Sequence, residues 1–418
     1  MKLVRSLILG STAALAAVAG ANAADLPSRK VAAVEYVRVC STYGEGFFYI
    51  PGTETCLRIG GRVRAEVLYA ETFSRASDAI GFRARGRLQA DVRTATAYGL
   101  LRTFVRFEIT QNSGTFGPNG SFGNSSEVAQ AFVQFGGLTA GKVTSFFDNP
   151  DLPTEHFGTL RFSDAPDIPV LAYTFSFGNG FSATLALEDG LTRRVGSTAV
   201  TGLDATGLPV FVANNYAGQT APDLVGNVRY AGTWGSAQLS GAVHQNRGKI
   251  VNGFEPDTEY GYAVGFQAGL NMPFMGAGDA AWFAATYTNG ALGYLGFGSE
   301  TTAGNATGLA SDVFTFADAN TSEARGWSLA GGVTHNWTPT LRSSLFGSWA
   351  DVNFSGAVNA GFGISDFREY RIGANTIWTP VSGLNFGLEV IYANVDPRGT
   401  GGRGDSATEG RIRVQRDF

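Results

Sequence analysis

The chain has 418 residues, a formal net charge of −4, 57 glycines and only 16% charged residues. This mild acidity argues against nucleic acid as a partner, because nucleic-acid-binding surfaces concentrate Lys and Arg. A glycine-rich, charge-poor composition is typical of many strands and turns, not of helices. The mean hydropathy is zero, as expected when apolar and polar residues alternate and cancel in any average.

The N-terminus has the features of an export signal. A basic start precedes an apolar run over residues 7–18, and Ala21-Asn22-Ala23 fits a signal-peptidase site. These features predict a signal peptide over residues 1–23, so the mature protein would lie outside the cytoplasm. The alternative is an N-terminal membrane anchor, but the apolar run is too short for a spanning helix.

Residues 24–56 are predicted to form an N-terminal segment that contains both cysteines of the chain, Cys40 and Cys56. An oxidising compartment favours a disulfide between them. Closing so short a loop would stabilise the fold by about 3 kcal/mol. A redox pair is the alternative, but the CxxC spacing is missing. Two ligands cannot form a structural zinc site, and we expect neither a metal nor a cofactor.

Residues 57–70 alternate between an apolar and a polar face. Ile59 and Val63 lie on one face, whereas Arg62 and Glu66 lie on the other. Because successive side chains of a strand point to opposite sides, the alternation predicts a strand. Its apolar face, exposed to water, would be an aggregation hazard, so repeated faces of this kind favour contact with lipid. The alternation recurs over residues 80–94, 101–111, 260–271, 327–337 and 384–392.

The connections between these segments alternate in length. Short turns such as Tyr98-Gly99 and Gly235-Ser236 alternate with longer loops such as 293–324. The alternation predicts about sixteen strands, with short periplasmic turns and longer outer loops. The predicted fold class is therefore all-β: a transmembrane antiparallel β-barrel over residues 57–418, wide enough for an aqueous channel. The charge-free stretches 260–278 and 280–299 could alternatively be spanning helices, but their glycines and alternation favour strands.

The C-terminus adds a second signal. The last residue, Phe418, shares a face with Ile412 and Val414. A terminal aromatic on an amphipathic last strand resembles the signal that barrel-assembly machinery reads. Arg416 departs from that pattern because an apolar residue is usual at its position.

Five segments of the sequence carry a resemblance to a known family. They are Val37-Arg38-Val39-Cys40, Tyr43-Gly44-Glu45-Gly46-Phe47-Phe48-Tyr49-Ile50-Pro51-Gly52, Cys56-Leu57-Arg58-Ile59-Gly60-Gly61, Val133-Gln134-Phe135-Gly136-Gly137 and Ser145-Phe146-Phe147-Asp148. These segments closely resemble alphaproteobacterial general porins. The resemblance implies a homotrimer of sixteen-stranded barrels in the bacterial outer membrane, among outer-membrane lipid and lipopolysaccharide. It further implies a third outer loop folded into the lumen, and passive diffusion of small hydrophilic solutes and ions.

The third outer loop corresponds to residues 148–169, and we expect it to form a pore constriction. Its carboxylates would face a basic wall on the lumen side of the first three strands and set a transverse field. Charged rings and pore width are the usual determinants of selectivity. The alternatives are an ordinary surface loop and ordinary solvated lumen arginines; the sign of the ion preference stays open. The acidic set is Asp148, Asp151, Glu155, Asp164 and Asp167, and the basic set is Arg62, Arg64, Arg83, Arg85, Arg87, Arg102 and Arg106.

The sequence gives weaker support to two other classes of function. A barrel enzyme would need a nucleophile beside a histidine, and none of His156, His244 and His335 has such a context, so we expect no enzyme. A phosphate loop at 136–142 is discarded because Val143 follows it. The remaining alternative is a surface adhesin or structural barrel, for which Arg403-Gly404-Asp405 is the one suggestive motif.

Overall fold

The computed structural model describes residues 38–117, 121–203, 205, 209–362, 364–399 and 403–418. The predicted signal peptide lies outside these ranges. Within them, no helix is both long and apolar enough to cross a membrane.

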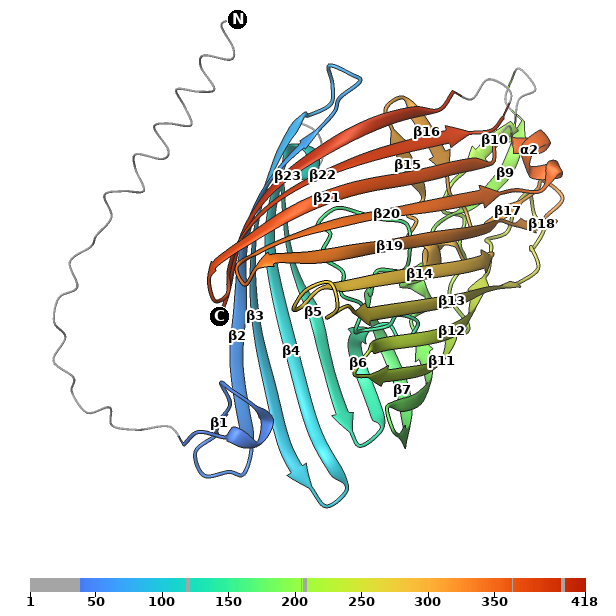
Figure 1. Cartoon of the computed structure of the whole chain (residues 1–418). Coiled ribbons are helices and arrows are strands. Elements are labelled where there is room, and N and C mark those ends of the chain that lie inside the picture. The colour runs from blue at the N-terminus through green and yellow to red at the C-terminus, as the bar shows by residue number, and fades with distance from the viewer. Residues whose placement is uncertain (1–37, 118–120, 204, 206–208, 363, 400–402) are drawn as a thin grey trace, which may run out of the picture. The chain divides into compact units, whose positions relative to one another are not determined.

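The described residues form a closed antiparallel barrel of 16 strands (Figure 1), as predicted. Each strand pairs with the next along the wall, and pairing of the first with the last closes the sheet. Residues 260–271 and 280–289 are strands, not helices. The turn predicted at Gly235-Ser236 lies slightly earlier, because β12 already begins at Gly235. The barrel strands are β2 (Cys56–Ala70), β3 (Ile80–Thr96), β4 (Gly99–Ser113), β5 (Phe122–Phe135), β6 (Leu138–Thr144), β7 (Asp167–Gly178), β8 (Phe181–Glu188), β11 (Asp223–Gly232), β12 (Gly235–Asn246), β13 (Glu259–Asn271), β14 (Ala280–Asn289), β19 (Arg325–Thr338), β20 (Leu341–Asn353), β21 (Phe367–Val381), β22 (Leu384–Pro397) and β23 (Asp405–Asp417).

The two faces of the wall differ as the alternation predicts. On β2, Ile59 and Val63 are more than half exposed on the outside. The intervening Arg62 and Glu66 point into the barrel, where Glu66 is buried among arginines. An outer face rich in exposed apolar side chains suits a hydrocarbon surround. The barrel therefore combines an apolar exterior with a polar lumen.

The N-terminal segment is bound to β2, next to the seam at which β2 and β23 pair. Cys40 and Cys56 form the predicted disulfide, and the short strand β1 (Phe48–Tyr49) pairs with the start of β2. At the same seam the Gly61 amide donates to the Phe418 carbonyl at 2.9 Å, and the Phe418 amide donates back to Gly61 at 3.1 Å. The last residue thus completes the closure between β2 and β23.

The longer outer loops contain structure of their own, which the sequence did not predict. They pack around a hydrophobic cluster that includes Phe314 and Val352, both fully buried. Burial raises the pKa of Asp312, whose carboxylate accepts hydrogen bonds from the Val195 and Leu292 amides. The loop elements are β9 (Ser197–Leu203), β10 (Pro209–Val212), β15 (Glu300–Ala303), β16 (Ala306–Leu309), β17 (Val313–Thr315), β18 (Thr321–Glu323), η3 (Gly190–Arg193), η4 (Leu292–Leu295) and α2 (Gly356–Phe362).

The Arg-Gly-Asp motif is not a free recognition sequence. The Asp405 carboxylate accepts hydrogen bonds from the Asn305 backbone and side-chain nitrogens, at 2.8 and 3.0 Å. Because that carboxylate already binds another loop, the motif gives the adhesin alternative little support.

The assignment of faces predicts opposite responses on one strand. Leu185 lies near the middle of β8 and is 56% exposed on the outside, so Leu185→Arg should lower the free energy of unfolding by about 2–4 kcal/mol. Ser182→Glu, on the lumen face of the same strand and directly opposite Arg229, is the charged control and should change it little. Urea titration of the protein in lipid vesicles measures both. Equal destabilisation by the two variants would contradict the assignment.

Candidate functional site in the barrel lumen

One side of the lumen is a basic wall, defined by the inward arginines of β2, β3, β4 and β23. All seven predicted wall arginines belong to it, because they share the inner face of paired strands. The sequence analysis missed Arg411 and Arg413 on β23. Their alternation with Ile412 and Val414 was the available signal, and the pairing of β23 with β2 brings them to the same wall.

Carboxylates within this wall are shared between several arginines. Glu66 lies 2.7 Å from Arg413 and 3.7 Å from both Arg83 and Arg411. Glu108 pairs with Arg85 and Arg87 in the same way, and Asp91 pairs with Arg93 and Arg102. Arginines therefore outnumber the acids that neutralise them.

The lumen also contains the loop between β6 and β7, residues 145–166, which we call the inner loop. Its Phe157 carbonyl accepts a hydrogen bond from Arg411 of the basic wall at 2.6 Å. Its Phe157 and Gly158 amides both donate to the Glu389 carboxylate at 2.6 Å. Glu389 lies on the inner face of β22, because its neighbours Leu388 and Val390 are exposed on the outside. The inner loop is thus held against the inside of the barrel wall.

A buried ion pair forms a second attachment of the inner loop to the barrel wall. The Arg161 guanidinium is 2.8 Å from Glu369 of β21, and Arg371 contacts the same carboxylate at 2.5 Å. Burial lowers the pKa of Arg161, while the charge of Glu369 opposes that shift. Leaving any member of such a group without its partner would be costly.

Glycines on the inner face make room for the inner loop. A Cβ atom at Gly265 would lie 2.8 Å from the Phe147 ring, and one at Gly387 would lie 2.5 Å from the Phe157 ring. Glycine inside a strand often marks such a close approach. The glycines on the polar face of 260–271 were therefore a signal for a packed loop.

The five predicted loop carboxylates have different partners. Asp148 is buried and pairs with Arg193 at 3.2 Å; Asp151 pairs with Arg229 and Glu155 with Arg342. Asp164 is half exposed and lies 3.8 Å from His156. Asp167 belongs to strand β7, not to the loop, and accepts from Gln130. Asp148 also lines a cavity with Arg102 and Arg106, and the opposition of the five acids to the seven arginines stays a prediction.

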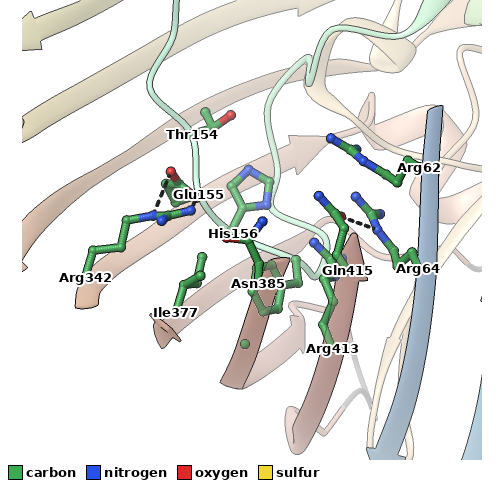
Figure 2. Close-up of a pocket in the computed structure, with 12 residues that line it drawn as sticks. Arg62, Arg64, Thr154, Glu155, His156, Arg342, Ile377, Asn385, Arg413 and Gln415 are labelled. Atoms are coloured by element: carbon green, nitrogen blue, oxygen red, sulfur yellow. Dashed lines mark hydrogen bonds and ion pairs between the residues drawn. The ribbon is translucent and has the colours of Figure 1, made fainter. Parts of the chain in front are cut away.

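Between the inner loop and the basic wall lies a cavity of about 270 Å³. Figure 2 shows Glu155 and His156 of the inner loop on one side and Arg62 and Arg64 of β2 on the other. Arg413 completes the basic side. A solute that crosses the lumen here would pass guanidinium groups.

The histidines have no nucleophile beside them. His244 bonds to Asp223, His335 to Asp279, and His156 to the Gly158 carbonyl. No hydroxyl group bonds to a histidine within the described residues. The same residues contain no cluster of His, Cys, Asp and Glu that could hold a metal ion.

Comparison with known sequences identifies the family of this chain. The model of the porin subfamily matches residues 25–415. Porin Omp2b of Brucella canis is 38% identical over 252 residues, which cover 57% of this chain and 65% of that protein. Porin Omp2b of Brucella abortus (strain 2308) matches with the same identity and coverage. The alignment thus spans slightly less than two thirds of these relatives.

Solved structures share the fold. The outer membrane channel DcaP of Acinetobacter baumannii has a TM-score of 0.64 and 17% identity, and the match covers 88% of this chain and 99% of that one. The trimer form of OmpT from Vibrio cholerae has a TM-score of 0.52 and 12% identity, covering 88% and 100%. OmpF of Salmonella typhi has a TM-score of 0.52 and 11% identity, covering 88% and 99%.

Glu389 should be the main polar anchor of the inner loop. Glu389→Ala removes a charged acceptor from the Phe157 and Gly158 amides, so the free energy of local opening should fall by about 3 kcal/mol. Hydrogen exchange at these two amides measures the effect. Glu409→Ala on β23 is the control, because no described inner-loop residue hydrogen-bonds to Glu409. Unchanged protection in the Glu389 variant would refute this anchor.

Proposed function

The chain belongs to the porin subfamily, and on that premise we propose that it forms a water-filled channel through the outer membrane for passive diffusion of small hydrophilic solutes and ions. The observation that carries this proposal is a closed barrel with an apolar exterior and a charged, partly open lumen. A channel of this kind needs no nucleophile, metal or cofactor. Family membership likewise favours a channel over an enzyme.

The inner loop and the basic wall together are proposed to form the constriction. The seven predicted arginines supply the basic side. Of the loop carboxylates, Asp151, Glu155 and Asp164 keep a third or more of their side chains exposed, so they supply the acidic side. The ion pairs of Asp151 and Glu155 weaken that side relative to the basic wall.

Export and assembly are proposed to follow the sequence signals. Residues 1–23 would be removed after export, leaving the segment that starts at residue 24. Barrel-assembly machinery would read the last strand, which ends in Phe418. In place, the apolar exterior would contact outer-membrane lipid, with lipopolysaccharide around the outer loops.

The assembled state is proposed to be a homotrimer. On the outer loop side of β4 and β5, the outward residues Gln111, Asn124 and Ser126 are polar and exposed. The corresponding ends of β13 and β22 instead carry exposed Tyr260 and Tyr392, which suit a lipid interface. A polar patch at that level is better covered by a second copy of the chain than by lipid.

The channel predicts a size-dependent permeability. Vesicles that contain the purified protein should swell in neutral sugars at rates that fall steadily as the sugar grows, because passive diffusion has no saturable step. Stepwise conductance should appear in planar bilayers. Heat-denatured protein is the control. A folded barrel that produces neither swelling nor conductance would exclude the channel.

The constriction predicts a strong effect of wall charge. Neutralising Arg62, Arg64, Arg85 and Arg87 together with glutamine should change single-channel conductance or ion preference, because the field at the narrowest section changes. Unchanged values in both measurements would place the constriction elsewhere.

The proposed oligomer predicts that a charge on the polar patch separates the subunits. Ser126→Arg should shift the mass of the detergent-solubilised protein from trimer to monomer by light scattering, because the interface would have to bury an unpaired guanidinium charge. Tyr260→Arg is the charge-matched control and should leave a trimer. A trimer in both variants would move the interface away from this patch.

A further inference from the structure

Two arginines of the basic wall hydrogen-bond only to side-chain amides within the part of the chain that the structure describes. The Arg64 Nε group donates to the Gln415 side-chain oxygen at 2.8 Å, and the Arg106 Nε group donates to the Gln89 side-chain oxygen at 3.3 Å. Neither forms an ion pair with a carboxylate of the described residues. Their charges are therefore available to interact with water and solutes in the lumen.

The carboxylates around Arg64 already form ion pairs with other arginines. Glu66 is shared by three arginines, and Asp417 pairs with Arg62 at 2.5 Å. Across the cavity, Glu155 is the one carboxylate among the lining residues, and it bonds to Arg342 at 3.2 Å. The other exposed loop acids, Asp151 and Asp164, do not line this cavity.

The cavity thus holds an excess of positive charge in confined water. Arg62 and Arg64 come from β2, and Arg413 comes from β23, which pairs with β2. Figure 2 shows these guanidinium groups near Glu155 and His156 of the inner loop, and the Phe157 ring of that loop lies 3.9 Å from the Arg413 guanidinium. A narrow passage with low-dielectric walls concentrates the field of such charges.

Guanidinium groups recognise oxyanions well. Their planar N–H donors match carboxylate and phosphate oxygens, often two at a time. Rings of Arg or Lys are a recurring device of pores for anions and phosphates. A doubly charged oxyanion can contact several of these groups together, whereas a neutral sugar gains nothing from their charge.

We propose that the cavity lined by Arg62, Arg64 and Arg413 is a binding site for small oxyanions of charge −2, and that it gives the channel a preference for anions. This inference rests on the proposed channel function and specifies the solute class that the constriction favours. Phosphate and dicarboxylate groups share the required chemistry, and the site lies directly on the solute path.

The test uses the double variant Arg64→Gln and Arg106→Gln, which leaves no carboxylate without its ion-pair partner and so should fold. In planar bilayers under a potassium chloride gradient, the unmodified channel should favour chloride. The chloride-to-potassium permeability ratio should fall several-fold in the double variant, because each lost positive charge removes an attraction for chloride and a repulsion of potassium at the same time. Arg75→Gln with Arg325→Gln removes the same charge outside the lumen and should leave the ratio unchanged.

Binding is measured separately with two probes, inorganic phosphate and malonate. Each should reduce the chloride current of the unmodified channel, and the half-blocking concentration should rise several-fold in the double variant and in Arg64→Gln alone. Block by only one probe would narrow the class to that chemistry and still support the site. A channel that conducts but favours potassium, or that is blocked equally in all variants, would overturn the inference. Absence of any conductance would instead overturn the channel function on which it rests.

Discussion

Closure of the sheet between β2 and β23 is the constraint on which the other features depend. In hydrocarbon, a backbone N–H or C=O group without a partner is costly, so a spanning sheet cannot keep a free edge. The pairing of Arg62 with Asp417 through Ala70 with Glu409 removes that edge. The reciprocal hydrogen bonds of Gly61 and Phe418 extend the closure to the last residue.

Closure also creates the chemical contrast between the two faces. Once the sheet is a cylinder, alternation sends every second side chain into one enclosed space. Arginines from four strands then meet on a single wall, where Glu66, Asp91 and Glu108 each pair with two or more of them. Charges that would be separate on an open sheet become one electrostatic surface.

The inner loop occupies part of the enclosed space. Backbone hydrogen bonds to Glu389 and the buried Arg161–Glu369 pair hold it against β21 and β22. Glycines at 265 and 387 let its aromatic rings approach the wall backbone. Asp148 pairs with Arg193 and Glu155 with Arg342, so the cavity beside the loop keeps an excess of guanidinium groups.

The sequence alone determined the properties that depend on neighbours along the chain. Alternation identified the strands and the two faces of residues 57–70, turn lengths indicated sixteen strands, and Cys40 and Cys56 indicated the disulfide. What sequence could not decide was which charges meet. The partners Asp148–Arg193 and Glu155–Arg342 are far apart in sequence, and Arg411 and Arg413 join the basic wall only through closure. The local signal fixes the face of a side chain, but its partner across the lumen depends on register and on the path of the inner loop, which only the folded barrel specifies.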